Sequence, residues 1–201
     1  MVRLLAAGMA AVNASAWVLV SRWERAGKGA RHRVKLRAPR LIRLGFDASL
    51  YTSLVYPVLV VIAPRWTYEG WGNWSSSIDP ALQAGGLVFW MLGMAGLLWA
   101  SRVMGRHLAI DGMAEDHELV TYGPYRYLRH PVYASFAAIA IGTALVFRSY
   151  VLLGLSVTLM VTGRWWANAE ERLLASTEGF GDVYRTYAAR TGRFLPRLRR
   201  R

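Results

Sequence analysis

Two charge-free runs dominate the C-terminal half of the chain: PVYASFAAIAIGTALVF at residues 131–147 and YVLLGLSVTLMVTG at residues 150–163. As helices they would be roughly 22 to 26 Å long, at about 1.5 Å per residue. Only Arg148 and Ser149 separate them, so they predict a helical hairpin with Arg148 at its tip. Small side chains in the first run would let the two limbs approach closely; they are Ala134, Ser135, Ala137, Ala138, Ala140 and Gly142.

Three further apolar stretches precede this hairpin, at residues 4–20, 46–63 and 81–101. A helix that crosses a bilayer needs roughly 20 residues, so each stretch predicts a membrane span. The first resembles the apolar core of a signal peptide, but it is long and its basic cluster follows it, so we expect a retained span. Pro57 predicts a kink in the second. With the hairpin, the stretches predict an all-α, multi-pass integral membrane protein of about five transmembrane helices.

The basic residues lie between the predicted spans. The 201-residue chain is 54% hydrophobic, with 25 basic and 12 acidic side chains and a formal net charge of +13. Residues 22–43 contain one acid and nine basic side chains: Arg22, Arg25, Lys28, Arg31, Arg33, Lys35, Arg37, Arg40 and Arg43. By the positive-inside rule, we expect this segment, residues 102–130 and the tail at 164–201 on the cytoplasmic side, with the N-terminus outside. Their expected partner is the anionic inner leaflet.

The same composition excludes other classes. Binding to nucleic acid requires basic residues interleaved with polar surface, whereas here they alternate with apolar blocks of spanning length, so no nucleic-acid partner is expected. The chain has no cysteine, which excludes disulfides, zinc–thiolate sites and a cysteine nucleophile. No other metal cluster is evident, and we expect no metal site.

The densest polar motif is HELVTYGPYRYLRHPVY at residues 117–133. The Gly-Pro pair at 123–124 predicts a turn, and Pro131 suits the first position of the following helix. Arg129 and His130 would then stand at the amino end of a membrane helix, where free backbone N–H groups favour an anion. Flat rings for a planar ligand are supplied by Tyr125, Tyr127 and Tyr133. The alternative is a set of interfacial anchors, which composition alone favours; the density and order of the motif favour a ligand site.

A second polar cluster follows the last apolar run. If the helix continues past Gly163, Arg164 and Glu171 share one face, with Glu170 beside them. A carboxylate pair near an arginine-rich loop could bind a cationic group. The alternative is a solvated first turn of an amphipathic tail helix, and these residues alone favour it.

Together with the ring spacing of Phe180, Tyr184 and Tyr187, these motifs resemble the integral-membrane methyltransferases typified by isoprenylcysteine carboxyl methyltransferase. The phospholipid N-methyltransferases share much of this signature. The resemblance covers about residues 105–196. It divides the chain into an N-terminal three-span membrane region, 1–104, and a cofactor-binding region with the hairpin and tail, 105–201. Taken alone, the ring spacing predicts packing.

The resemblance implies that S-adenosylmethionine binds on the cytoplasmic side, in a pocket closed by the polar segment and the tail, with a tunnel open to lipid. The expected cofactor-binding residues are His117, Leu119, Val120, Tyr125, Arg129, His130, Pro131, Tyr133 and Glu170. The expected catalytic residues are Arg164, as the cation that orients the acceptor, and Glu170 and Glu171, one of which engages the ribose or the amino group. Methyl transfer from a sulfonium requires positioning and exclusion of water rather than a nucleophile on the enzyme.

The predicted function is therefore an S-adenosylmethionine-dependent methyltransferase. Its lipophilic acceptor would be an isoprenylcysteine-like carboxylate, a phospholipid headgroup or a small hydrophobic molecule, and the sequence does not choose among oxygen, nitrogen and sulfur. One alternative is a membrane reductase of the steroid-reductase type, which would need a larger phosphate-binding surface with more basic residues within 117–133. Another is a non-catalytic membrane protein whose basic loops hold anionic lipid.

Overall fold

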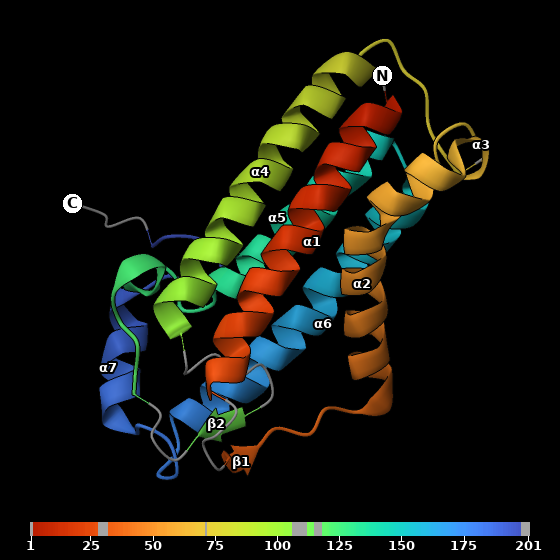
Figure 1. Cartoon of the computed structure of the whole chain (residues 1–201). Coiled ribbons are helices and arrows are strands. Elements are labelled where there is room, and N and C mark those ends of the chain that lie inside the picture. Colours follow the sequence, from red (N-terminus) through yellow and green to blue (C-terminus); the bar gives the residue numbers. More distant parts are fainter. Residues whose placement is uncertain (1, 28–31, 71, 106–111, 115–117, 198–201) are drawn as a thin grey trace.

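Long helices lying side by side make up the body of the protein in the computed structural model (Figure 1). The structure describes residues 2–27, 32–70, 72–105, 112–114 and 118–197. Within these described ranges, three helices are long and apolar enough to cross a membrane: α1 (Val2–Gly27), α2 (Arg40–Ile62) and α4 (Asp79–Met104). They contain the three predicted N-terminal spans almost entirely. Pro57 lies inside α2, which changes direction along its length in Figure 1.

The predicted hairpin is confirmed. It consists of α5 (Pro131–Phe147) and α6 (Tyr150–Leu174). Arg148 lies between them in the left-handed conformation, with φ 53° and ψ 41°, and its N–H donates to the carbonyls of Ala144 and Leu145. The side chain of Ser149 caps α6 by accepting from the N–H of Leu152. The second limb is longer than the apolar run, because no helix breaker lies between Gly163 and Leu174.

The small residues of α5 face a different partner from the one predicted. An added Cβ at Gly142 would lie 2.5 Å from the N of Trp90 and 2.6 Å from the O of Gly86, both on α4. An added Cβ at Gly93 would lie 2.8 Å from the N of Ile139. The prediction that these residues bring the hairpin limbs together is therefore wrong for Gly142, since α4 supplies complementary glycines that let its backbone meet α5.

Polar side chains bind the hairpin tip to the first residue of α4 and to the chain between α2 and α4, which includes α3 (Pro64–Thr67). An Nη1 atom of Arg148 lies 2.7 Å from Oδ2 of Asp79, and its guanidinium carbon lies 4.6 Å from the ring centre of Tyr68. Asn73 donates from Nδ2 to the carbonyl of Phe147 at 2.8 Å. This end of the bundle is therefore closed by direct hydrogen bonds.

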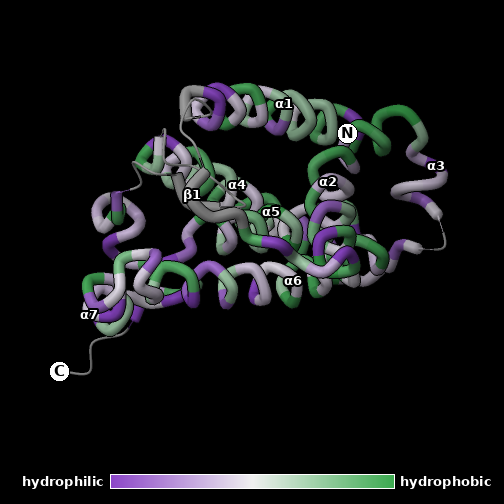
Figure 2. The backbone as a smooth tube through the Cα atoms, turned by 90° about the horizontal axis from the view of Figure 1, so that it is seen from below, coloured by the Kyte–Doolittle hydropathy of each residue, from purple (hydrophilic) through white to green (hydrophobic). Residues whose placement is uncertain are grey.

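The polar segments gather at the opposite end (Figure 1). They carry the strands β1 (His32–Lys35) and β2 (Gly112–Ala114), which pair antiparallel, the 3₁₀ helix η2 (Gly123–Arg126) and α7 (Asp182–Arg190). The strands were not predicted, because their partners are far apart in sequence. Figure 2 shows hydrophilic residues on α7 and at one end of α1.

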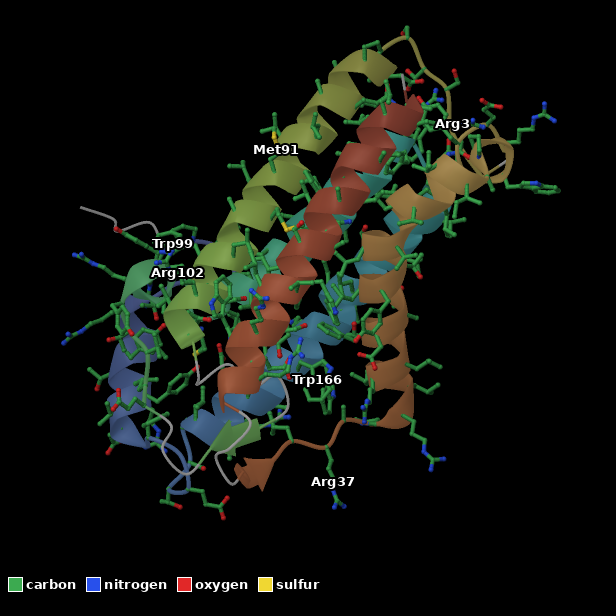
Figure 3. The ribbon with its side chains drawn as sticks, viewed as in Figure 1. Arg3, Arg37, Met91, Trp99, Arg102 and Trp166 are labelled. Carbon is green, nitrogen blue, oxygen red and sulfur yellow. The ribbon has the colours of Figure 1, made fainter. Side chains whose placement is uncertain are left out.

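Large apolar side chains are exposed along the bundle, as expected for contact with lipid tails. On α2 and α4 they include Val55, Val58, Leu59, Val88, Phe89, Met91 and Leu92. On α6 they include Val151, Leu153, Val157, Met160 and Val161. In Figure 3 the side chain of Met91 points away from the other helices. The apolar exterior and the three long apolar helices support an integral membrane protein.

Candidate functional site

The turn before α5 forms as predicted and places His130 directly before the first residue of that helix. Gly123 has φ 61°, a left-handed conformation that favours glycine, and an added Cβ would lie 2.9 Å from Cγ2 of Val103. Pro131 is the first residue of α5, where its missing N–H has no helical partner to lose. His130 therefore stands at the amino end of α5, and it is buried.

The C-terminal tail lies alongside the motif. The N–H of Arg129 donates to the carbonyl of Gly192 at 2.8 Å, and the N–H of His130 donates to the carbonyl of Arg193 at 3.1 Å. In return, the N–H of Gly192 donates to the carbonyl of Tyr127. The tail is thus held by backbone hydrogen bonds against the residues that precede α5.

One carboxylate oxygen of Glu171 lies close to three basic side chains. Oε1 of Glu171, on α6, lies 2.9 Å from Nε of Arg129, 3.0 Å from Nε2 of His130 and 3.2 Å from Nε of Arg193. Arg129 also donates from Nη1 to the carbonyls of Ala188 and Thr191. Arg129 and His130 do hold an anion, as the sequence predicted, but in this structure that anion belongs to the protein itself.

Glu170 has a freer carboxylate. Its Oε2 lies 3.5 Å from Nδ1 of His130, and 31% of its side chain is exposed, against 23% for Glu171. The Tyr133 hydroxyl is a further polar neighbour of Glu170. A carboxylate has about four acceptor positions, so Glu170 can accept a further donor.

Both ring nitrogens of His130 face carboxylates. Burial lowers the pKa of His130, but hydrogen bonds and charge from Glu170 and Glu171 outweigh burial, and the net pKa is raised above 6.5. The protonated ring donates from both nitrogens, which matches its two acceptors.

This raised pKa predicts a pH dependence of stability. His130 contributes its full stabilisation below pH 6.5, the unfolded value, and loses it as the pH rises through the folded value. The titratable side chains around the ring are Arg129, Tyr133, Glu170, Glu171 and Arg193. We expect the melting temperature in detergent to fall as the pH rises from 6.5 through the folded-state pKa of His130, and to fall less in His130→Gln. Equal slopes in the two proteins would contradict this prediction.

Buried tyrosines border the cluster. Tyr125 is buried, and burial together with the charge of Glu170 raises the pKa of its hydroxyl, which stays protonated. That hydroxyl has no hydrogen-bond partner among the described residues, nor does the hydroxyl of buried Tyr184. Tyr187 donates from its hydroxyl to the carbonyl of Tyr125 at 2.7 Å. The predicted packing of the tail rings is confirmed for Tyr184 and Tyr187, whose ring centres lie 6.0 Å apart.

The structure brings together most of the predicted site residues. The amino end of α5 and the end of α6 unite Arg129, His130, Pro131, Tyr133, Glu170 and Glu171. Val120 and Tyr125 pack with Ala100 in a small cluster, and Leu119 is partly buried. His117 lies outside the described residues.

Arg164 does not join the cluster. It lies on α6, seven residues before Glu171, but it is exposed, whereas the tail covers Glu171 through Arg193. Arg193 itself was not predicted, although its Nη2 also donates to Oδ1 of Asn168. It belongs to no periodic pattern, so only its position in space reveals it.

A cavity of about 600 Å³ opens beside this cluster, between α1, α2, α4, α5 and α6. Its apolar wall includes Phe46 and Phe136, whose ring centres lie 6.2 Å apart. The ring of Phe46 also packs 6.0 Å from that of Tyr133, which in turn lies 5.6 Å from the ring of His130. One aromatic contact therefore connects the cavity wall to the polar cluster.

Comparisons with known proteins point to one chemistry. Residues 82–179 match the family model of the phospholipid methyltransferases. Over 91 residues the chain is 34% identical to protein-S-isoprenylcysteine O-methyltransferase of Schizosaccharomyces pombe (strain 972 / ATCC 24843). The predicted resemblance to integral-membrane methyltransferases is confirmed. The aligned part is 45% of this chain and 38% of that relative, so the chain matches well under half of the relative's length. The segment that matches the family model includes α5, Glu170 and Glu171 but not α1, α2 or Arg193.

Proposed function

We propose that this protein transfers a methyl group from S-adenosylmethionine to a lipophilic acceptor. The observation that carries the proposal is that the segment matching methyltransferases builds the His130–Glu171 cluster, one aromatic contact from an apolar cavity. The cofactor would bind beside the cluster, and the acceptor would occupy the cavity. Basic residues at this end support a cytoplasmic orientation, with five spans and the site at the inner leaflet.

The chain's own polar groups fit the cofactor. S-adenosylmethionine carries a sulfonium, which supplies the methyl group, together with an ammonium and ribose hydroxyls. Glu170 has acceptor capacity for an ammonium or a hydroxyl, and the orphaned hydroxyl of Tyr125 lies within its electrostatic reach. We assign Glu170 to cofactor contact, with His117, Leu119 and Val120 lining the site as the resemblance implies. Glu171 is a positioning residue, because it holds three cations of the protein.

The remaining residues would position the reactants and exclude water. Methyl transfer is an in-line displacement that gains most from alignment in a site without water. The tail covers the cluster through backbone bonds to Arg129 and His130. Arg164, which the resemblance implies as the acceptor-orienting cation, is exposed and is not among the cavity-lining residues. Arg37 and Arg43 do line the cavity, together with the acidic residues Glu24 and Asp47.

Calorimetry on the detergent-purified protein tests this function. We expect saturable, micromolar heat with S-adenosylmethionine, none with reduced nicotinamide dinucleotide, and transfer of labelled methyl groups into a lipid, prenyl thiol or amine fraction. His130→Ala should weaken cofactor binding at least tenfold. Tyr122→Ala is the control, because this exposed ring lies in the same motif outside the cluster. A folded protein that binds the dinucleotide would be a reductase, and one that binds only anionic vesicles would be a lipid-binding protein.

A further inference from the structure

The cavity beside the cluster contains two buried polar groups that lack partners. Asn13 is 6% exposed; its Nδ2 donates to the carbonyl of Leu54 at 2.8 Å, and its Oδ1 has no partner among the described residues. A carbonyl can only accept, so this bond directs the NH₂ group to Leu54 and leaves the oxygen free. Trp166 is 7% exposed, and its Nε1–H also lacks a partner in that part of the chain. Both residues line the cavity.

Unsatisfied buried groups call for an explanation, because each costs about 1 to 3 kcal/mol. Here one is an acceptor on α1 and the other a donor on α6, and Trp166 lies inside the bundle, between the lower parts of α1 and α2, in Figure 3. The wall around them is apolar and includes Ala16, Leu50, Leu54, Met94, Leu97 and Phe136. A ligand that satisfies both groups must itself both donate and accept hydrogen bonds within an otherwise lipophilic body.

The charged side chains that line the cavity indicate which ligand charge it favours. Four charged residues line it, two basic and two acidic: Glu24, Arg37, Arg43 and Asp47. Arg43 and Asp47 lie 3.7 Å apart, from Nε to Oδ2. Their formal charges cancel, in contrast to the +13 of the whole chain. A cavity whose charged lining residues sum to zero formal charge favours an uncharged ligand over a phosphate or a carboxylate.

From these groups we propose that the cavity binds an uncharged, single-chain lipophile bearing a hydroxyl or amide, which donates to Oδ1 of Asn13 and accepts from Nε1 of Trp166. The volume of about 600 Å³ is typical of a site for one small molecule. Trp166 lies one helical turn before Glu170 on α6, so the ligand reaches the neighbourhood of the proposed cofactor site. Its identity as the methyl acceptor rests on the proposed function, whereas its binding does not.

Binding of tritiated 1-dodecanol to the protein in nanodiscs tests the proposal, with empty nanodiscs as background and no methyl donor present. We expect saturable binding that unlabelled dodecanol competes for, and that dodecane, dodecanoate and dodecyl phosphate compete for at least tenfold more weakly. Asn13→Leu and Trp166→Phe should each weaken binding about tenfold, the effect of one buried hydrogen bond. Trp99→Phe is the control, because this exposed ring on α4 does not line the cavity.

A second readout uses the indole ¹⁵N–¹H resonance that Trp166→Phe removes, which identifies it. This resonance should shift on addition of 1-dodecanol and stay unchanged with dodecane. The proposal would be overturned by equal competition from dodecane or dodecyl phosphate, or by unchanged affinity in Trp166→Phe. It would also be overturned if the cavity holds water and binds no 1-dodecanol. Dodecanol binding without methyl transfer to any acceptor would instead overturn the proposed function and leave this inference standing.

Discussion

Glu170→Gln is expected to abolish methyl transfer and to weaken binding of S-adenosylmethionine more than tenfold, while the melting temperature falls only slightly. The reason is that Glu170 contacts His130 at a long distance of 3.5 Å, has the Tyr133 hydroxyl as a further neighbour, and keeps acceptor positions for a ligand. Glu171→Gln should instead lower the free energy of unfolding by about 2 kcal/mol, because three cations lose the charge of their shared partner. This loss in the free energy of unfolding is smaller than the usual cost of breaking a fully buried ion pair, because Glu171 is partly exposed.

Thermal unfolding in detergent and calorimetry of cofactor binding measure the two effects separately. Glu178→Gln is the matched control, since this exposed carboxylate follows α6 and should change neither quantity. If Glu170→Gln unfolds at a much lower temperature while Glu171→Gln loses only cofactor affinity, the two roles are reversed. If neither variant loses affinity, the cofactor does not bind at this cluster.

Local signals were enough to predict the elements around the site. The turn at 123–124, Pro131 at the start of α5 and Arg148 at the hairpin tip all depend on residues adjacent in sequence, and each is found where predicted. Proline and glycine act through their own backbone, so their effect is readable without knowing the fold. The charge distribution likewise predicted that the polar segments share one end.

Contacts between distant segments were not predictable in the same way. Arg193 joins Glu171 across 22 residues of chain, and nothing in its neighbourhood distinguishes it from the other basic residues of the tail. The length of α6 was underestimated because hydropathy marks apolar sequence, whereas a helix continues until a breaker stops it. The exposed position of Arg164 depends on the tail, which covers Glu171 and not Arg164.

Gly142→Ala is expected to lower the free energy of unfolding by about 2 kcal/mol. The new methyl group would lie 2.5 Å from the N of Trp90 and 2.6 Å from the O of Gly86, which are backbone atoms that no side-chain rotation can move. Overpacking of this kind costs about 1 to 3 kcal/mol, more than the roughly 1 kcal/mol that alanine contributes over glycine in a helix. Gly85→Ala is the control on α4, where an added Cβ has nothing within 4 Å.

The effect should extend to the site, because α5 carries the Gly142 contact in its C-terminal half and begins directly after His130. Separating α4 from α5 would move the amino end of α5 relative to α6, and with it the distances from His130 to Glu170 and Glu171. We therefore expect Gly142→Ala to weaken cofactor binding as well as stability, whereas Gly85→Ala changes neither. If Gly142→Ala unfolds at the wild-type temperature, the spacing of α4 and α5 is not set by this backbone contact.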